Sequence, residues 1–401
     1  MPDPATTGTR SAPRRHRLLL AMLVAVAVVL ALALAEATLR AMARRAAAAT
    51  HRYMTADPVL HHRARPRFST IVAGTPFTTS SLGLYDREFT SPKPASTFRV
   101  LMLGDSFTEG AGLRLEDTVA KRVERALGAR GCRTYEVVNA GAASYSPILE
   151  YLQLERLAPV LTPDLVILNF DMTDVHDDVV RTATAVLDAR GLPLAVPNDP
   201  TRESAVLLPP PRALGPLGRA LPHLAVYQAV RKSGPGQWLF GSVRPSPERL
   251  QADGLVGDLE RDPIAIARDG DDAALARGWA LTERYLVGIR DRARGRGIPF
   301  VLVVYPHPYQ VSAEESRAGR RQIGAGPGLY ASTRPFARLE ALGRREGFPV
   351  VNLLESFRAR LAEGPLFRAG DIHHTPAGAA VFADGIVTSL RALDVLPRCA
   401  G

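Results

Sequence analysis

The sequence contains little cysteine. Its 401 residues include only two, Cys132 and Cys399. Zinc sites built from cysteine need closely spaced thiolates, so a zinc–cysteine site is excluded. A disulfide between the two is permitted in an oxidising compartment, and the sequence leaves their pairing open.

Lysine is equally scarce. Three of the 50 basic residues are lysine, which leaves 47 arginines, and the net charge is +10. The arginines are spread along the whole chain, and no motif of a DNA- or RNA-binding fold accompanies them. The positive charge therefore reflects a bias of composition, and we expect no nucleic-acid partner. Internal repeats are also absent.

One long apolar run stands near the N-terminus, from Leu18 to Ala35. Its 18 residues are enough to cross a bilayer core of roughly 30 Å as a helix. Arginines flank it equally: Arg10, Arg14, Arg15 and Arg17 precede it, and Arg40, Arg44, Arg45 and Arg52 follow it. Charge therefore does not settle the orientation. We expect an uncleaved membrane anchor with the rest of the chain outside the cytoplasm. A cleaved signal peptide ending at Ala33-Leu34-Ala35 is the alternative.

The remaining chain predicts one α/β domain. We divide the sequence into a basic tail (1–17), an anchor (18–35), a juxtamembrane stalk (36–75) and a folded domain (76–401). Short apolar strands are expected at 99–103, 135–138, 165–168, 299–305 and 349–354. Helices are expected at 115–127, 146–157, 273–294, 334–346 and 379–393. This alternation predicts a parallel sheet between helices. Residues 180–265 interrupt it, and we interpret them as an insertion, either a surface excursion or a lid.

Polar residues follow the predicted strands. The first strand ends in Gly104-Asp105-Ser106, the second in Asn139-Ala140-Gly141, and the third is followed by 169–174. Carboxyl ends of parallel strands meet at one edge of a sheet, so these segments are expected to converge. Asp371 and His373 stand in a further loop before the last helix. A serine needs a base to take its proton, and an acid that orients this base, so the pattern suggests serine hydrolysis.

Four segments resemble the GDSL hydrolases in their SGNH form, specifically the bacterial type with a single N-terminal membrane anchor. They are GDSFTEG (104–110), VVNAGAASYSP (137–147), PDLVILNFDMTDVHDD (163–178) and DIHHTPAG (371–378). The resemblance covers about residue 80 to the C-terminus. It implies a flavodoxin-like three-layer α/β/α sandwich with a central parallel sheet. It also implies an ester or O-acyl substrate, such as a small molecule or an acetylated carbohydrate, and no cofactor.

The resemblance also implies roles for individual residues. Ser106 matches the nucleophile, His373 the catalytic histidine and Asp371 its acidic partner. Backbone N–H groups of Ser106 and Gly141 match oxyanion-hole donors. The family often places the acid three residues before the histidine, and that spacing would make His374 the base.

The third segment departs from the family pattern. Thr173 stands before Asp174, where the family has an asparagine whose amide completes the oxyanion hole. Either Thr173 replaces it, or Asn169 supplies the amide, or activity is weak. Asp174, Asp177 and Asp178 are expected in a solvated acidic loop, with no metal.

The predicted function is that of a membrane-anchored serine esterase. An O-acyltransferase of envelope glycans and a non-catalytic glycan-binding envelope protein are the alternatives. His307 follows the strand expected at 299–305 and is either a pocket residue or an ordinary loop residue.

Overall fold

The structure is a computed structural model, and it describes residues 14–129, 133–198, 224–232, 262–270, 273–323, 326 and 328–397. The chain divides into two units, Met1–Ala48 with Val206–Gly241, and Ala49–Ala205 with Ser242–Gly401. The predicted insertion lies largely outside the described residues, and with it the lid hypothesis. Cys132 and Cys399 lie outside them as well.

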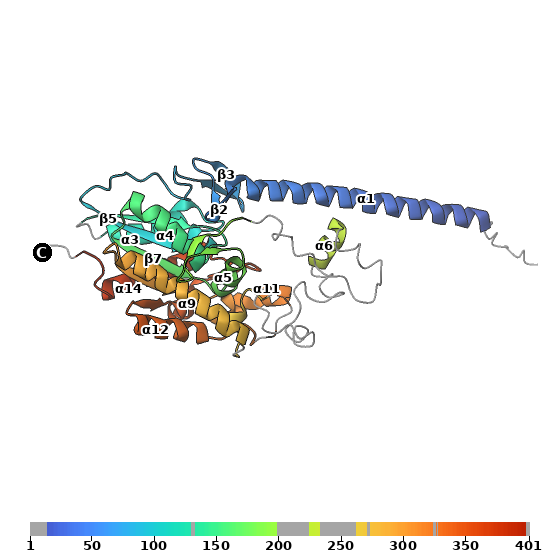
Figure 1. Ribbon diagram of the computed structural model, residues 1–401. Coiled ribbons are helices and arrows are strands. Elements are labelled where there is room, and N and C mark those ends of the chain that lie inside the picture. Colours follow the sequence, from blue (N-terminus) through green and yellow to red (C-terminus); the bar gives the residue numbers. More distant parts are fainter. Residues whose placement is uncertain are drawn as a thin grey trace, which may run out of the picture. The chain divides into compact units, whose positions relative to one another are not determined.

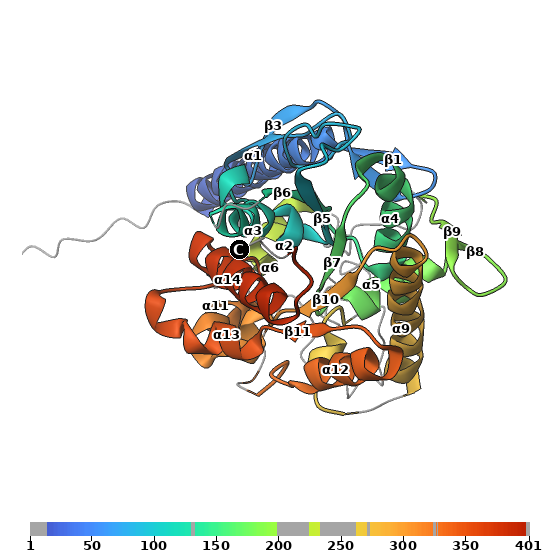
Figure 2. The same ribbon diagram turned by 90° about the vertical axis from the view of Figure 1, so that its left-hand side faces the viewer.

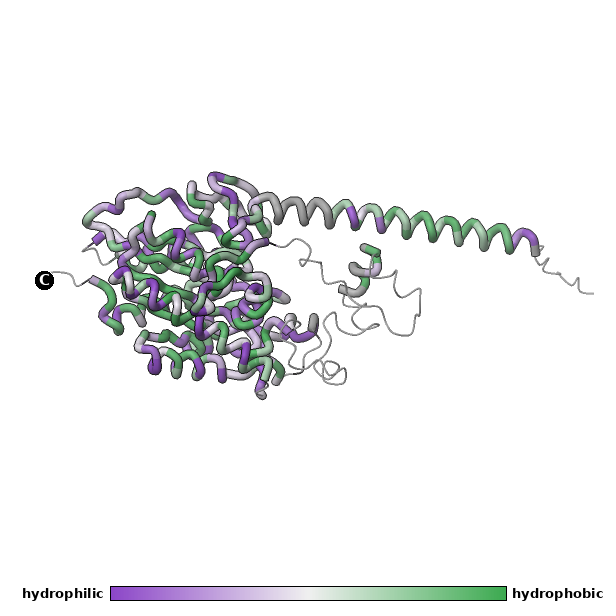
Figure 3. The backbone as a smooth tube through the Cα atoms, in the orientation of Figure 1, coloured by the Kyte–Doolittle hydropathy of each residue, from purple (hydrophilic) through white to green (hydrophobic). Residues whose placement is uncertain are grey.

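The first unit holds most of α1 (Arg14–Tyr53) and the short α6 (Ala225–Lys232). The apolar side chains of α1 are exposed, with Leu18 at 65% and Leu34 at 70%. Figure 3 shows the apolar colour continuing along this stretch of the helix. Arg15–Met42 is the one described helix long and apolar enough to cross a membrane, a test that a signal sequence also passes.

The second unit is built on a five-stranded sheet (Figure 1). Its strands are β5 (Thr97–Gly104), β6 (Thr134–Gly141), β7 (Leu165–Phe170), β10 (Phe300–Val304) and β11 (Val350–Asn352). All neighbouring pairs are parallel, in the order β11-β10-β7-β5-β6. If the five strands are numbered 1 to 5 along the chain and the sheet is followed from β6 to β11, the order is 2-1-3-4-5, which is the flavodoxin-like arrangement. The predicted fold class is therefore confirmed.

Helices cover both faces of the sheet (Figure 2). One layer consists of α4 (Pro147–Leu161), α5 (Asp174–Thr182), α9 (Ala273–Arg294) and α12 (Arg334–Glu346). The other consists of α3 (Val119–Gly128), α13 (Leu354–Ala359) and α14 (Pro376–Ala392). Alternate residues of β5 serve the two layers: Leu101 and Leu103 join the first core, and Val100 and Met102 join the second. Covering both faces is why this strand is a continuous apolar run.

Short elements complete the unit. The helices are α2 (Ser106–Glu109), α10 (Pro308–Val311) and α11 (Ala313–Ile323), with 3-10 turns at Leu115–Asp117, Ala265–Ala267 and Leu361–Glu363. The hairpins are β1 (Met54–Asp57) with β2 (His61–Ala64), β3 (Ser69–Val72) with β4 (Thr75–Thr78), and β8 (Val186–Leu187) with β9 (Pro193–Ala195).

The segment expected as a stalk differs from that expectation. Its first part continues α1 to Tyr53, and its second part forms the β1–β2 and β3–β4 hairpins. Tyr53 and Leu60 are only 3% and 2% exposed, so this stretch packs into the domain. Its polar composition concealed this because a few large side chains make the contacts.

Candidate active site

Ser106 stands where β5 turns into α2. Gly104 has a φ of 153°, and a Cβ at this position would lie 2.1 Å from Thr108 Oγ1, so only glycine fits the turn. Asp105 caps α2, because its Oδ1 accepts the N–H of Phe107 at 2.9 Å. The turn thus fixes Ser106 at the first position of a helix on the carboxyl edge of the sheet.

His373 lies beside Ser106, although 267 residues separate them. Its Nε2 is 2.8 Å from Ser106 Oγ, and its Nδ1 is 2.7 Å from Asp371 Oδ1. A carboxylate only accepts, so Nδ1 carries the proton and Nε2 of a neutral ring accepts from the serine hydroxyl. The hydrogen bond from His373 lowers the pKa of Asp371 to about 2. The structure therefore joins three of the predicted site residues in one hydrogen-bonded chain.

His374 points the other way. It is 2% exposed and packs among five aromatic rings, those of Phe107, Tyr305, Phe357, Phe367 and Phe382. Neither ring nitrogen has a partner within the described part of the chain. Burial, helped by the charges of His373 and His307, lowers its pKa to about 3. His374 is therefore a neutral core side chain, and the alternative pairing of Asp371 with His374 is not formed.

Gly141 does not present its N–H to the site. That group donates to Asn139 Oδ1 at 3.2 Å. The reason for glycine here is packing: a Cβ would lie 2.2 Å from the backbone nitrogen of Glu109 in α2. The expectation that Gly141 supplies an oxyanion donor is corrected accordingly.

The two side chains considered as oxyanion donors are also engaged. The Thr173 hydroxyl donates to Asp171 Oδ2 at 2.6 Å, and the Thr173 N–H donates to the same oxygen at 3.0 Å. Asn169 is fully buried, and its Nδ2 donates to Thr108 Oγ1 at 2.9 Å. Both act within the fold, so neither contributes the amide that the family pattern leads one to expect.

Two backbone groups remain near the serine. The N–H groups of Ser106 and Ser144 have no acceptor among the described residues. Ser144 has a φ of 59°, an unusual conformation for serine that is often found at functional sites. Its loop lies next to the serine turn because Ala142 N–H donates to Gly104 O at 3.1 Å. Strand β2 contacts this loop through a hydrogen bond between His62 Nε2 and Ala143 O, which are 2.7 Å apart. Ser144 was not predicted as a site residue, since nothing about its residue type signals a left-handed backbone.

Several solved structures similar to this chain are described as GDSL-like lipases or acylhydrolases. A GDSL-like lipase from Bacteroides thetaiotaomicron is 13% identical, matched over 76% of this chain and 93% of its own, with a TM-score of 0.36. A lipase/acylhydrolase from Enterococcus faecalis is 12% identical over 76% and 100%, with a TM-score of 0.36. An acetyl xylan esterase is 14% identical over 73% and 100%, with a TM-score of 0.37.

No protein-family model and no curated protein matches the chain. The similarity to the GDSL structures is distant, so the chemistry assigned to this chain rests on its own residues.

A second histidine–aspartate pair lies next to Phe107, the residue after Ser106. His307 Nε2 is 2.7 Å from Asp171 Oδ1, and both side chains are 1% exposed. Burial would raise the pKa of Asp171, but the attraction and hydrogen bond of His307 hold it below its usual range. The His307 ring also stacks on Phe107, with centroids 5.6 Å apart. The sequence does not decide between a pocket and a loop position for His307, although His307 follows a strand as directly as Ser106 does.

The acidic residues 174–178 do not form the solvated loop that the sequence suggested. Asp174 and Asp178 are fully buried on α5. Asp178 accepts from Ile148 N–H at 2.9 Å and from the Thr282 hydroxyl at 2.7 Å. Burial nevertheless raises its pKa to about 7, and burial with the charge of Glu150 raises that of Asp174. Among the described residues no group of three or more His, Cys, Asp or Glu side chains is arranged to hold a metal.

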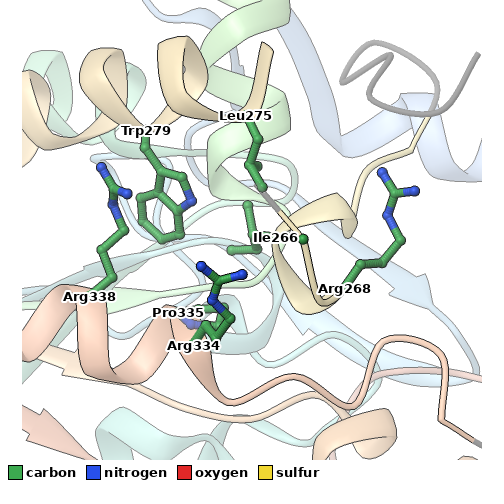
Figure 4. A pocket seen from close by; sticks show the side chains of 8 residues that line it. Ile266, Arg268, Leu275, Trp279, Arg334, Pro335 and Arg338 are labelled. Atoms are coloured by element: carbon green, nitrogen blue, oxygen red, sulfur yellow. The ribbon is translucent and has the colours of Figure 1, made fainter. Parts of the chain in front are cut away.

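Two cavities differ in size and place. The larger, about 690 Å³, is bordered by α11 and by residues of the segment 361–375, although Asp371 and His373 of that segment are not among its lining residues. Its volume is in the range of small-molecule sites. The smaller, about 100 Å³, lies between α9 and α12, where Arg338 packs against Trp279 and Arg334 reaches toward Ile266 (Figure 4).

Proposed function

We propose that this protein is a membrane-anchored serine esterase. The observation that supports the proposal is the hydrogen-bonded chain Ser106–His373–Asp371, with distances of 2.8 and 2.7 Å. Ser106 Oγ attacks the ester carbonyl while its proton passes to His373 Nε2. The tetrahedral intermediate collapses, and the departing alcohol takes that proton. Water then attacks the acyl-enzyme and loses a proton to His373. The bond between the acyl carbon and Ser106 Oγ breaks, His373 returns the proton to that oxygen, and the carboxylic acid leaves.

Asp371 supports this mechanism through its charge. Because its pKa is lowered to about 2, the carboxylate stays ionised at any pH where the histidine works as a base. An ionised Asp371 holds the Nδ1 proton in place and stabilises the imidazolium that forms after attack.

Backbone groups are the proposed oxyanion donors. Ser106 N–H lies at the first position of α2, and Ser144 N–H lies on the neighbouring loop. Each lost donor typically costs about 100- to 1000-fold in rate, so two backbone donors would compensate for the engaged Thr173 side chain.

The anchor and its orientation belong to the same proposal. The apolar part of α1 would span the membrane, and the catalytic domain would lie outside the cytoplasm. Esters in the envelope, such as acetylated glycans or small molecules, would then be the accessible substrates.

The test uses the full chain in detergent micelles with p-nitrophenyl acetate and a serine-directed phosphonate. We expect turnover and labelling of one serine, both abolished in Ser106→Ala. His373→Ala should lower kcat/KM by about 10⁴-fold or more. The exposed Ser69→Ala is the matched control and should retain full activity. An inactive and unlabelled but folded parent chain would refute the proposal.

One observation favours a second candidate, a non-catalytic glycan-binding protein. Thr173, Asn169 and Gly141 all direct their donors to other protein groups. Failure of the esterase test together with binding of a glycan to the parent chain would select this candidate. An acyltransferase would instead hydrolyse slowly and move the acyl group to an added glycan acceptor.

A further inference from the structure

Arg368 lies on the same face of a short hairpin as His373. Phe367 and His374 form an antiparallel bridge, and Arg368 N–H donates to His373 O at 3.0 Å. Residues opposite each other in an antiparallel pair point to the same side. Phe367 and His374 point into the core, so Arg368 and His373 both point away from it.

The Arg368 guanidinium is held beside the site. It packs over Gly112, where an added Cβ would lie 2.2 Å from Nη1. Gly112 belongs to the loop that follows α2, the helix that begins at Ser106. Arg368 also contributes to the low pKa of Asp371, after the larger effects of His373. No carboxylate is within ion-pair distance of Arg368 in the described part of the chain.

The Arg368 side chain lines the 690 Å³ cavity. Arg368 lines it together with Arg321 of α11 and the apolar side chains of Leu361, Pro365 and Phe367. Two glutamates and a further arginine, Arg317, also border the cavity, and both glutamates have partners. Glu315 accepts the N–H groups of Leu366 and Phe367 at 2.8 and 3.1 Å, and Glu314 pairs with Arg317.

We propose that Arg368, with Arg321, recognises an anionic group on the ester substrate, a carboxylate or a phosphate. The proposal rests on the esterase function and narrows it. The guanidinium fork suits planar oxyanions, and an apolar cavity wall strengthens the attraction. The preferred substrates are therefore acyl esters of acidic molecules, bound with the anion in the cavity and the ester carbonyl at Ser106.

The experiment compares three acetyl esters with similar leaving groups, measured as acetate release by the full chain in detergent. They are 4-acetoxybenzoate, 4-acetoxyphenyl phosphate and the neutral 4-acetoxybenzamide. The variants are Arg368→Gln and Arg321→Gln, and the matched control is Arg344→Gln, an exposed arginine of α12. We expect Arg368→Gln to lower kcat/KM for at least one anionic ester about 10-fold or more, mainly through KM. Activity on the neutral ester should stay within about twofold.

Each outcome either supports or overturns the proposed role of Arg368. The anionic ester that loses most identifies carboxylate or phosphate as the preferred group. An equal loss on charged and neutral esters would mean that Arg368 acts only through Asp371, and this would overturn the proposal. Unchanged rates on both anionic esters would overturn it as well, with the esterase function intact. If the parent chain hydrolyses none of the three esters, the proposed function itself fails and this inference falls with it.

Discussion

Replacing His374 by leucine tests the assignment of the two adjacent histidines. The imidazole of His374 is surrounded by aromatic rings, and both its nitrogens lack partners within the described residues. Leaving a polar group buried without a hydrogen bond costs about 1–3 kcal/mol. Leucine has a similar volume and no polar atoms, so we expect His374→Leu to be as stable as the parent at pH 7 or more stable.

The stability difference between His374→Leu and the parent is expected to grow as the pH falls. Burial lowers the pKa of His374 from 6.5 to about 3, so between these values the unfolded chain binds a proton that the folded chain excludes. The free energy of unfolding of the parent therefore decreases with falling pH. Between pH 6.5 and pH 4.5 this term changes by about 2.3 kcal/mol. His374→Leu lacks it, so the stability of the variant relative to the parent should rise by that amount.

Urea denaturation of both proteins in detergent, followed by tryptophan fluorescence at pH 4.5, 5.5 and 6.5, measures the difference directly. Buried carboxylates add their own pH dependence, but they are common to both proteins and cancel in the comparison. A difference that does not change with pH would refute the burial argument. Loss of esterase activity in His374→Leu, with His373→Ala active, would make His374 the base.

Four further predictions concern the stability of the domain, three of them at buried positions behind the site. Gly141→Ala places a methyl group 2.2 Å from a backbone nitrogen and should destabilise the domain by about 3 kcal/mol. Gly128→Ala, which meets no atom within 4 Å, should instead stabilise α3 by about 0.5–1 kcal/mol in the same urea titration. Burial raises the pKa of Glu109 from 4.5 to about 8. Between those values the folded chain holds a proton that the unfolded chain has lost, so the free energy of unfolding decreases by up to about 1.4 kcal/mol for each unit that the pH rises. Denaturation at several pH values should show this slope lost in Glu109→Gln. Asp171→Asn breaks the buried pair with His307 and should cost about 3–5 kcal/mol in urea, whereas an unchanged midpoint would show that the pair is dispensable.

Local sequence patterns predicted most of the sheet and its helices. The helix expected at 273–294 is α9, and the strand expected at 165–168 extends by two residues to Phe170. These elements bury continuous or periodic apolar residues, which a sequence displays directly. The β1–β2 hairpin was not predicted because its strands are polar and are held by a few contacts with residues that are distant in the sequence.

Contacts between distant parts of the chain also limited what could be predicted of the site. The strand-end rule identified Ser106, and the order of residues before the last helix identified Asp371 and His373. Residue type did not reveal that His374 faces the core or that Gly141 is needed for packing. These properties depend on which side of a loop faces the sheet, and the hairpin between Phe367 and His374 determines that side.

The carboxylates near the site separate according to the partners that the fold supplies. Asp371 and Asp171 each have a histidine, and both have pKa values below the usual range. Glu109 and Asp178 are buried with only neutral donors near them, and their pKa values rise to about 8 and about 7. At pH 7 Asp371 and Asp171 are therefore ionised, Asp178 is about half protonated and Glu109 is mostly protonated. In the proposed mechanism, the ionised Asp371 would stabilise the imidazolium that forms at His373.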